Sequence, residues 1–189
     1  MAEHSPQDVY SLPAGLPIPV DDGACRHLPG HAVPQIGLAS TSGREIFLSD
    51  LPGRTVVFCY PRTGAPGQPV PAGWDEIPGA RGCTPEACAF RDLHTQIREA
   101  GAGVVGMSTQ STDYQQEMVA RLKLPYEVLS DAKLAFVRAL ALPTFTFDGA
   151  ELMKRLTLVI RDGVIEHVFY PVFPPDRHAA EVLPWLERR

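Results

Sequence analysis

The sequence predicts an α/β protein in which a mixed central β-sheet is flanked by helices. Strand-like and helix-like segments alternate between residues 55 and 141, an order that is typical of α/β architectures. A hairpin signal at Asp162-Gly163 and a closing helix follow, so antiparallel strands should join the sheet. The length of 189 residues suits one domain with a buried core.

The N-terminal third is predicted to lead into the first buried strand. Residues 1–32 are rich in proline and show little periodicity, so we expect an extended or partly disordered arm before a domain that spans 33–189. A turn and a short strand are expected at 42–48. β-Branched and aromatic residues predict a buried strand at 55–60. Residues 61–82 contain five prolines and five glycines, which indicates an insertion before the next helix.

A helix is expected directly after this insertion. Thr84 is its predicted cap, Pro85 occupies the first helical position, and Gly101 ends it. Apolar side chains recur at helical spacing along the segment, at Ala87, Phe90, Leu93, Ile97 and Ala100.

The remaining elements follow from the same patterns. Asp162-Gly163 separates two apolar segments and predicts a hairpin of strands 156–160 and 164–169. A last helix follows Pro174-Pro175-Asp176, and Pro184 is expected to kink or shorten it. Between the insertion and the hairpin we expect a strand at 104–107, a helix at 111–123, a strand at 126–129 and a helix at 131–141.

Composition and charge exclude several classes of function. The net charge is −5 and no basic cluster is present, which argues against nucleic-acid binding. No apolar segment approaches the roughly 18 residues of a membrane helix. The first residues lack the features of a secretory signal, so we expect a cytoplasmic location. Four cysteines are too few for a disulfide scaffold, and a close pair in a reducing compartment is expected to be catalytic or metal-binding.

Two of these cysteines, Cys83 and Cys88, lie five residues apart at the expected helix start. Residues five apart in an ideal helix are roughly 8–9 Å apart at Cα, whereas a disulfide needs less than about 7 Å. The pair therefore cannot bond while the first turn is wound. This suits a site with two states, a wound helix with reduced Cys83 and an opened helix with a disulfide. The helix terminus is also expected to favour the thiolate and lower the pKa of Cys83.

Other interpretations of the cysteines stay open. Both members of the pair could be small packing residues of the helix. A zinc site is disfavoured because the spacing does not match, and His27 and His31 lie in the unpatterned arm. Cys59 falls within a predicted strand and is expected to be a core thiol, while Cys25 receives no role.

Tyr60-Pro61 and the run from Gly82 to Asp92 resemble the peroxiredoxins. The similarity is greatest to the Q-type, or bacterioferritin-comigratory-protein, branch of the alkyl hydroperoxide reductase and thiol-specific antioxidant family. A second similar segment is 155–163, where the family places an arginine just before a core strand and hairpin. The resemblance extends from about residue 33 to the C-terminus and implies a thioredoxin fold with an N-terminal extension.

The resemblance also implies an activity and the residues that carry it. It implies a thioredoxin-dependent, atypical two-cysteine peroxidase with Cys83 as peroxidatic and Cys88 as resolving cysteine. Arg155 would lie beside Cys83, stabilise the thiolate and polarise the peroxide, and Glu86 would orient this arginine. The implied partners are a hydroperoxide, either hydrogen peroxide or an organic one, and thioredoxin or a similar dithiol. No metal, haem or nucleotide cofactor is implied, and a monomer or a homodimer is expected.

The sequence departs from the family where the insertion splits its active-site motif. The family has a proline seven residues and a threonine three residues before the peroxidatic cysteine, where this chain has Glu76 and Ala80. The hydroxyl that holds the peroxide is therefore assigned to Thr84 or to Thr63.

The role of the insertion itself has two interpretations. The segment, with Trp74, lines the substrate pocket or only covers an exposed edge. Phe145 and Phe147 are expected to pack in the core, with an apolar wall near Arg155 as the alternative.

Two other functions remain compatible with the cysteine pair. A thioredoxin-like disulfide oxidoreductase would be favoured by a Cys-x-x-Cys motif, which this chain lacks. A non-catalytic redox sensor or binding module would use the disulfide to change the 61–82 surface.

Overall fold

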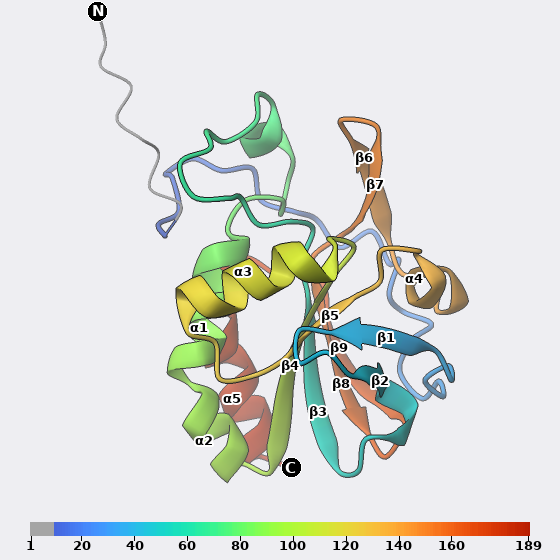
Figure 1. Cartoon of the computed structure of the whole chain (residues 1–189). Coiled ribbons are helices and arrows are strands. Elements are labelled where there is room, and N and C mark those ends of the chain that lie inside the picture. The colour runs from blue at the N-terminus through green and yellow to red at the C-terminus, as the bar shows by residue number, and fades with distance from the viewer. Residues whose placement is uncertain (1–9) are drawn as a thin grey trace, which may run out of the picture.

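The computed structural model describes residues 10–189, and its centre is a seven-stranded mixed sheet flanked by helices (Figure 1). The strand order is β2-β1-β5-β4-β3-β8-β9. β3 pairs in parallel with β4, and β4 with β5, while the outer pairs are antiparallel. The strands of this sheet are β1 (Gly37–Ser40), β2 (Glu45–Phe47), β3 (Arg54–Cys59), β4 (Ala102–Ser108), β5 (Val128–Ser130), β8 (Leu156–Arg161) and β9 (Val164–Phe169). The predicted mixed sheet with flanking helices is confirmed.

Successive side chains of β3 point to opposite faces of the sheet, and each face packs against its own apolar core. Val56 and Phe58 face a core that is covered by four helices, whereas Val57 and Cys59 face a second core on the other side. α4 (Ala135–Ala139) covers the second core together with residues 25–33. The helices over the first core are α1 (Cys83–Asp92), α2 (His94–Glu99), α3 (Thr112–Leu122) and α5 (His178–Glu187).

The expected continuous helix over 84–100 is wrong, because the chain forms α1 and α2 with a break at Leu93. Thr84 is also not the cap. The helix begins two residues earlier, and its N-cap is Gly82, whose left-handed backbone (φ 105°) a side chain would strain. Cys83 is therefore the first residue of α1.

Two further boundaries differ from the prediction. The short strand lies at 128–130 rather than 126–129, and α4 begins at Ala135 rather than near 131. The buried Asp131 explains the late start, because its carboxylate accepts hydrogen bonds from the backbone N–H groups of Phe136 and Val137. α5 continues through Pro184 to Glu187 instead of ending early.

A second hairpin was not predicted. β6 (Thr144–Phe147) and β7 (Ala150–Met153) form a separate two-stranded sheet that extends from the same end of the molecule as the insertion (Figure 1). Its turn, Asp148-Gly149, has two positive φ angles, as does Asp162-Gly163. The same dipeptide therefore signalled both hairpins.

The N-terminal segment is attached to the domain wherever the structure describes it. Leu28 and Val33 are buried in the second core, and Ala32 forms a β-bridge with Val164. The first nine residues of the expected arm lie outside the described residues. Within residues 10–189, no helix has the length and apolar character needed to cross a membrane.

Candidate active site

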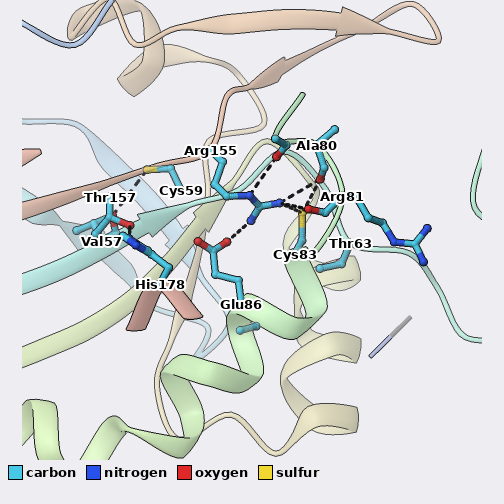
Figure 2. Close-up of polar contacts among 12 residues, drawn as sticks. Val57, Cys59, Thr63, Ala80, Arg81, Cys83, Glu86, Arg155, Thr157 and His178 are labelled. Carbon is cyan, nitrogen blue, oxygen red and sulfur yellow. Dashed lines mark hydrogen bonds and ion pairs between the residues drawn. The ribbon is translucent and has the colours of Figure 1, made fainter. Parts of the chain in front are cut away.

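The thiol of Cys83 lies at the N-terminus of α1, at the end of the sheet where the insertion returns (Figure 2). Cys83 as a whole is only 4% exposed. The thiol donates to the carbonyl oxygen of Ala80 at 3.6 Å and accepts a hydrogen bond from Arg155 Nη2 at 3.1 Å. The sulfur is therefore held by a backbone acceptor and a cationic donor.

Arg155 connects this sulfur to the end of the insertion. It immediately precedes β8 and is 3% exposed. Besides the sulfur, its guanidinium forms an ion pair with Glu86, which lies one turn after Cys83 on α1 and is fully buried. The structure thus brings together the three residues that the resemblance linked (Figure 2). The guanidinium also donates to the carbonyl oxygens of Gly79 at 3.1 Å, Ala80 at 3.0 Å and Arg81 at 3.3 Å.

Burial and charge act in opposite directions on the Cys83 thiol. Burial raises the pKa of Cys83, the charge and hydrogen bond of Arg155 lower it, and the negative charge of Glu86 raises it again. The net direction is upward, so the expected lowering at a helix terminus is outweighed in the wound helix. The charge of Arg155 is the largest of the influences that lower this pKa, and a backbone hydrogen bond from Arg62 lowers it further.

Glu86 has a second neighbour that the sequence did not suggest. Burial raises the pKa of Glu86, while the charges of Arg155 and His178 lower it. His178 is buried at the start of α5, and its Nε2 forms a hydrogen bond of 2.9 Å with Thr157 Oγ1 (Figure 2). Its Nδ1 lies 3.1 Å from Glu181 Oε2. No local sequence pattern around His178 predicts that it lies near Glu86, because this proximity depends on how α5 packs against β8 and α1.

Cys88 lies on the same wound helix as Cys83, and both are free thiols. Its side chain is half-buried against the core under α1. Burial raises the pKa of Cys88, and the charge of Arg91 opposes this. Cys83 and Cys88 therefore occupy one helix in the reduced form, as the spacing argument requires.

A pocket opens beside Cys83, and the insertion forms most of its wall. Thr63, Val70 and Trp74 line the pocket together with Cys83 and Thr84. The segment 61–82 therefore lines the pocket, which was one of its two interpretations.

Aromatic packing holds this wall in place. Trp74 packs against Phe145 and Phe147 of β6, with ring centroids 6.0 Å and 4.9 Å apart. Phe145 also lines a second hollow, on the side of Arg155. The two phenylalanines therefore anchor the insertion in a small satellite core of their own.

Both candidate threonines reach the pocket, and one of them has partners that sequence reasoning missed. The Thr63 hydroxyl donates to Gln110 Oε1 at 3.2 Å, and Gln110 Nε2 donates to the Thr63 carbonyl at 3.1 Å. Tyr114 also donates its hydroxyl to that carbonyl at 3.1 Å. Thr84 lies 4% exposed in the first turn of α1.

The remaining cysteines lie away from this pocket. Cys59 is fully buried, and burial raises its pKa well above the ordinary value. Burial also raises the pKa of Cys25 to about 12. Both pack in the second core, where such thiols are unreactive. Within residues 10–189, no three His, Cys, Asp or Glu side chains gather in a way that could hold a metal ion.

Comparison with known proteins identifies the family. Residues 28–183 match the Redoxin family. The chloroplastic peroxiredoxin Q of Oryza sativa subsp. japonica is 33% identical over 160 residues, which cover 84% of this chain and 66% of that protein. The chloroplastic peroxiredoxin Q of Gentiana triflora is 30% identical over 186 residues, covering 95% and 78% of the two chains. The solved structure of peroxidoxin BcpB from Mycobacterium tuberculosis is 30% identical and has a TM-score of 0.68, covering 86% and 98%.

These matches agree with the fold of the chain. The chain spans 66% of the length of the rice relative but nearly all of the solved mycobacterial structure. The thioredoxin fold expected from the sequence is confirmed by this structural match. The chain therefore belongs to the Redoxin family and, within it, to the Q-type peroxiredoxins.

Proposed function

We propose that this chain is a thiol-dependent peroxidase that reduces hydrogen peroxide and organic hydroperoxides. One contact carries the proposal: Arg155 Nη2 donates to the sulfur of Cys83 at 3.1 Å, beside a pocket that can admit a small substrate. A guanidinium at that position can stabilise the thiolate and the negative charge that develops on the peroxide oxygens. Glu86 fixes the orientation of this guanidinium through their ion pair.

In the first step, the Cys83 thiolate attacks the terminal oxygen of the hydroperoxide ROOH. An S–O bond forms while the O–O bond breaks, so the sulfur is oxidised and the peroxide is reduced. The hydroperoxy proton stays on the sulfenic acid. The alkoxide RO⁻ leaves and takes a proton from water, which gives an alcohol, or water when R is hydrogen.

In the second step, the first turn of α1 opens and Cys88 condenses with the sulfenic acid. The new disulfide releases one water molecule. A dithiol such as thioredoxin then reduces it by exchange, so one hydroperoxide and one dithiol become an alcohol, a water and an oxidised dithiol. This is an atypical two-cysteine cycle within one chain, which works as a monomer or a homodimer. The expected location is the cytoplasm, where dithiol reductants are maintained.

A threonine hydroxyl beside Cys83 is expected to bind the peroxide. We assign this role to Thr84, because the Thr63 hydroxyl already donates to Gln110. Thr84→Val keeps the shape of the side chain and removes only the hydroxyl, so comparison with Thr63→Val tests this assignment. A larger loss of peroxidase activity in Thr63→Val would transfer the role to Thr63.

Intact mass after one equivalent of hydrogen peroxide tests the cycle. The wild-type protein should lose two hydrogen atoms, with the change in a peptide that contains both cysteines. Cys88→Ser should instead gain one oxygen atom, and Cys83→Ser should show neither change and no turnover. Full peroxidase activity in Cys83→Ser would refute the proposal. A disulfide oxidoreductase would reduce protein disulfides and spare peroxide, and a sensor would oxidise without repeated turnover.

A further inference from the structure

The insertion places another arginine, Arg62, at the pocket of Cys83. Arg62 follows Tyr60-Pro61 directly and lines the same pocket as Cys83. Its guanidinium carbon lies 5.6 Å from the centre of the Trp74 ring. Trp74 is itself 5% exposed and fixed by its contacts with β6. The ring therefore acts as a platform that holds the Arg62 charge at the pocket wall.

Among the residues that the structure describes, Arg62 has no carboxylate partner, unlike the other arginines of the site. Arg155 pairs with Glu86, and Arg81 pairs with Asp75 at 3.0 Å. Among the ion pairs formed by residues 10–189, none includes Arg62. Glu151 lines a neighbouring hollow with Arg62, but it lies within ion-pair distance of Arg138, at 3.9 Å.

The charges around the pocket therefore leave one cation uncompensated. Arg155 and Arg81 are neutralised by their carboxylates, so within residues 10–189 Arg62 is the pocket-lining arginine whose positive charge stays unbalanced when Cys83 is protonated. Much of the remaining wall is apolar, and it includes Val70, Pro71 and Trp74. A ligand that matches this wall has an apolar body and one anionic group.

We propose that the pocket selects organic hydroperoxides that carry a carboxylate, and that Arg62 binds this carboxylate. The inference rests on the proposed peroxidase function, because it requires the hydroperoxy group to meet Cys83. A guanidinium can donate two parallel hydrogen bonds to a carboxylate, and that of Arg62 lies over the Trp74 ring at the pocket wall. Arg62 is thus a specificity-determining residue that the insertion contributes.

The test compares two hydroperoxides that differ in one group. Cumene hydroperoxide and its para-carboxylate are assayed on the full chain, and the ratio of their kcat/KM values is taken for each variant. This ratio cancels any general change in the reactivity of Cys83. We expect Arg62→Gln to lower the carboxylate-to-neutral ratio by about three- to tenfold, as for one partly exposed charge pair. Arg62→Lys keeps the positive charge but loses the planar guanidinium, so its carboxylate-to-neutral ratio should lie between those of the wild type and Arg62→Gln.

Arg98→Gln is the matched control, because it makes the same charge change at an exposed site on α2. Its ratio should equal that of the wild type. The wild-type ratio should also fall as salt is added, since screening weakens the attraction, while the Arg62→Gln ratio should stay flat.

Two failures are distinguishable. Equal ratios in the wild type and Arg62→Gln, with peroxide turnover intact, would overturn only this inference. An absence of turnover of hydrogen peroxide by the wild type would instead refute the proposed peroxidase function. Should Arg62→Gln fold poorly, equal ratios in the wild type and Arg62→Lys, together with a wild-type ratio unchanged by salt, would overturn the inference.

Discussion

The sulfur of Cys83 lies between two opposing electrostatic influences. Arg155 stabilises its thiolate, whereas burial and the charge of Glu86 destabilise it. Glu86 nevertheless fixes the arginine that opposes it, because an unpaired guanidinium would be costly at a site this buried. We therefore expect the reactivity of the thiol to depend on this buried ion pair as well as on the helix terminus.

Replacing Arg155 should raise the pKa of Cys83, because its charge and hydrogen bond lower that pKa. Peroxidase activity rises with pH as the thiol ionises, so the midpoint of this rise should move to higher pH in Arg155→Gln. Loss of the cationic donor should also reduce kcat/KM for hydrogen peroxide by about 10²- to 10³-fold at neutral pH. The pH profile and the ultraviolet absorbance of the thiolate measure both effects. Arg161→Gln, at the exposed end of β8, is the control, and an unchanged profile in Arg155→Gln would contradict the assigned role.

Replacing Glu86 should move the same profile in the other direction. Glu86→Gln removes a negative charge that raises the pKa of Cys83, so the midpoint should fall to lower pH. The variant leaves Arg155 buried without its carboxylate, and the free energy of unfolding should drop by about 3 kcal/mol. Urea unfolding and the pH profile are the measurements. Asp92→Asn, whose side chain is 63% exposed, should change neither. A midpoint that rises in Glu86→Gln would show that positioning of Arg155 outweighs the direct charge effect.

At the scale of elements, the first turn of α1 is built to open. Its N-cap, Gly82, has no side chain to accept hydrogen bonds from the orphan N–H groups of the helix. The backbone bond from Glu86 N to Gly82 O, at 3.0 Å, joins this turn to its cap. The missing side-chain cap removes one source of stability from this turn, whose opening the proposed approach of Cys88 to Cys83 requires.

Gly82 is also closely packed. Comparing its replacement with that of Gly101 distinguishes steric overlap of a new side chain from strain in a left-handed backbone. A Cβ there would overlap the side chains of Leu12 and Pro175, whereas a Cβ at Gly101 would meet nothing within 4 Å. Both glycines have left-handed backbones, with φ of 105° and 82°. Gly82→Ala should therefore cost about 1–3 kcal/mol more than Gly101→Ala in urea unfolding, and it should also lower peroxidase activity. Equal costs in the two variants would disprove the overlap.

Local patterns predicted the elements well wherever one signal was present. The hairpin of β8 and β9 and the strand β3 lie within a residue of their predicted positions. The hairpin of β6 and β7 has the same Asp-Gly dipeptide in a turn of the same geometry, but it was not among the predicted elements. The break at Leu93 could not be predicted, because the apolar spacing continues through it.

At the scale of the whole molecule, the N-terminal segment clamps the active-site helix. Leu12 and Pro175, which come from opposite ends of the chain, pack against Gly82, and Pro19 lies against Gly79. These contacts hold the backbone just before Cys83. Opening the first turn of α1 for disulfide formation should therefore require this clamp to loosen.

Weakening the clamp should favour the disulfide over further oxidation. In Leu12→Ala, we expect Cys83 and Cys88 to join faster after a peroxide pulse, and less sulfinic acid to form at high peroxide. Stopped-flow tryptophan fluorescence and mass spectrometry measure the two outcomes. Val20→Ala, at a residue that is 81% exposed, should behave as the wild type does. Slower disulfide formation in Leu12→Ala would show that the segment assists opening instead.

The amino-acid sequence was sufficient to predict the alternation of strands and helices, the hairpin at Asp162-Gly163, and the placement of two thiols on one helix. Each of these depends on residues that are close along the chain, where periodicity and turn preference act directly. The resemblance implied that Arg155, 72 residues from Cys83, lies beside it, but its hydrogen bond to the sulfur and the position of Arg62 over Trp74 at the pocket are visible only in the folded chain. Those contacts follow from how the sheet, the insertion and β6 pack together, and no local pattern encodes the distance between side chains from separate elements.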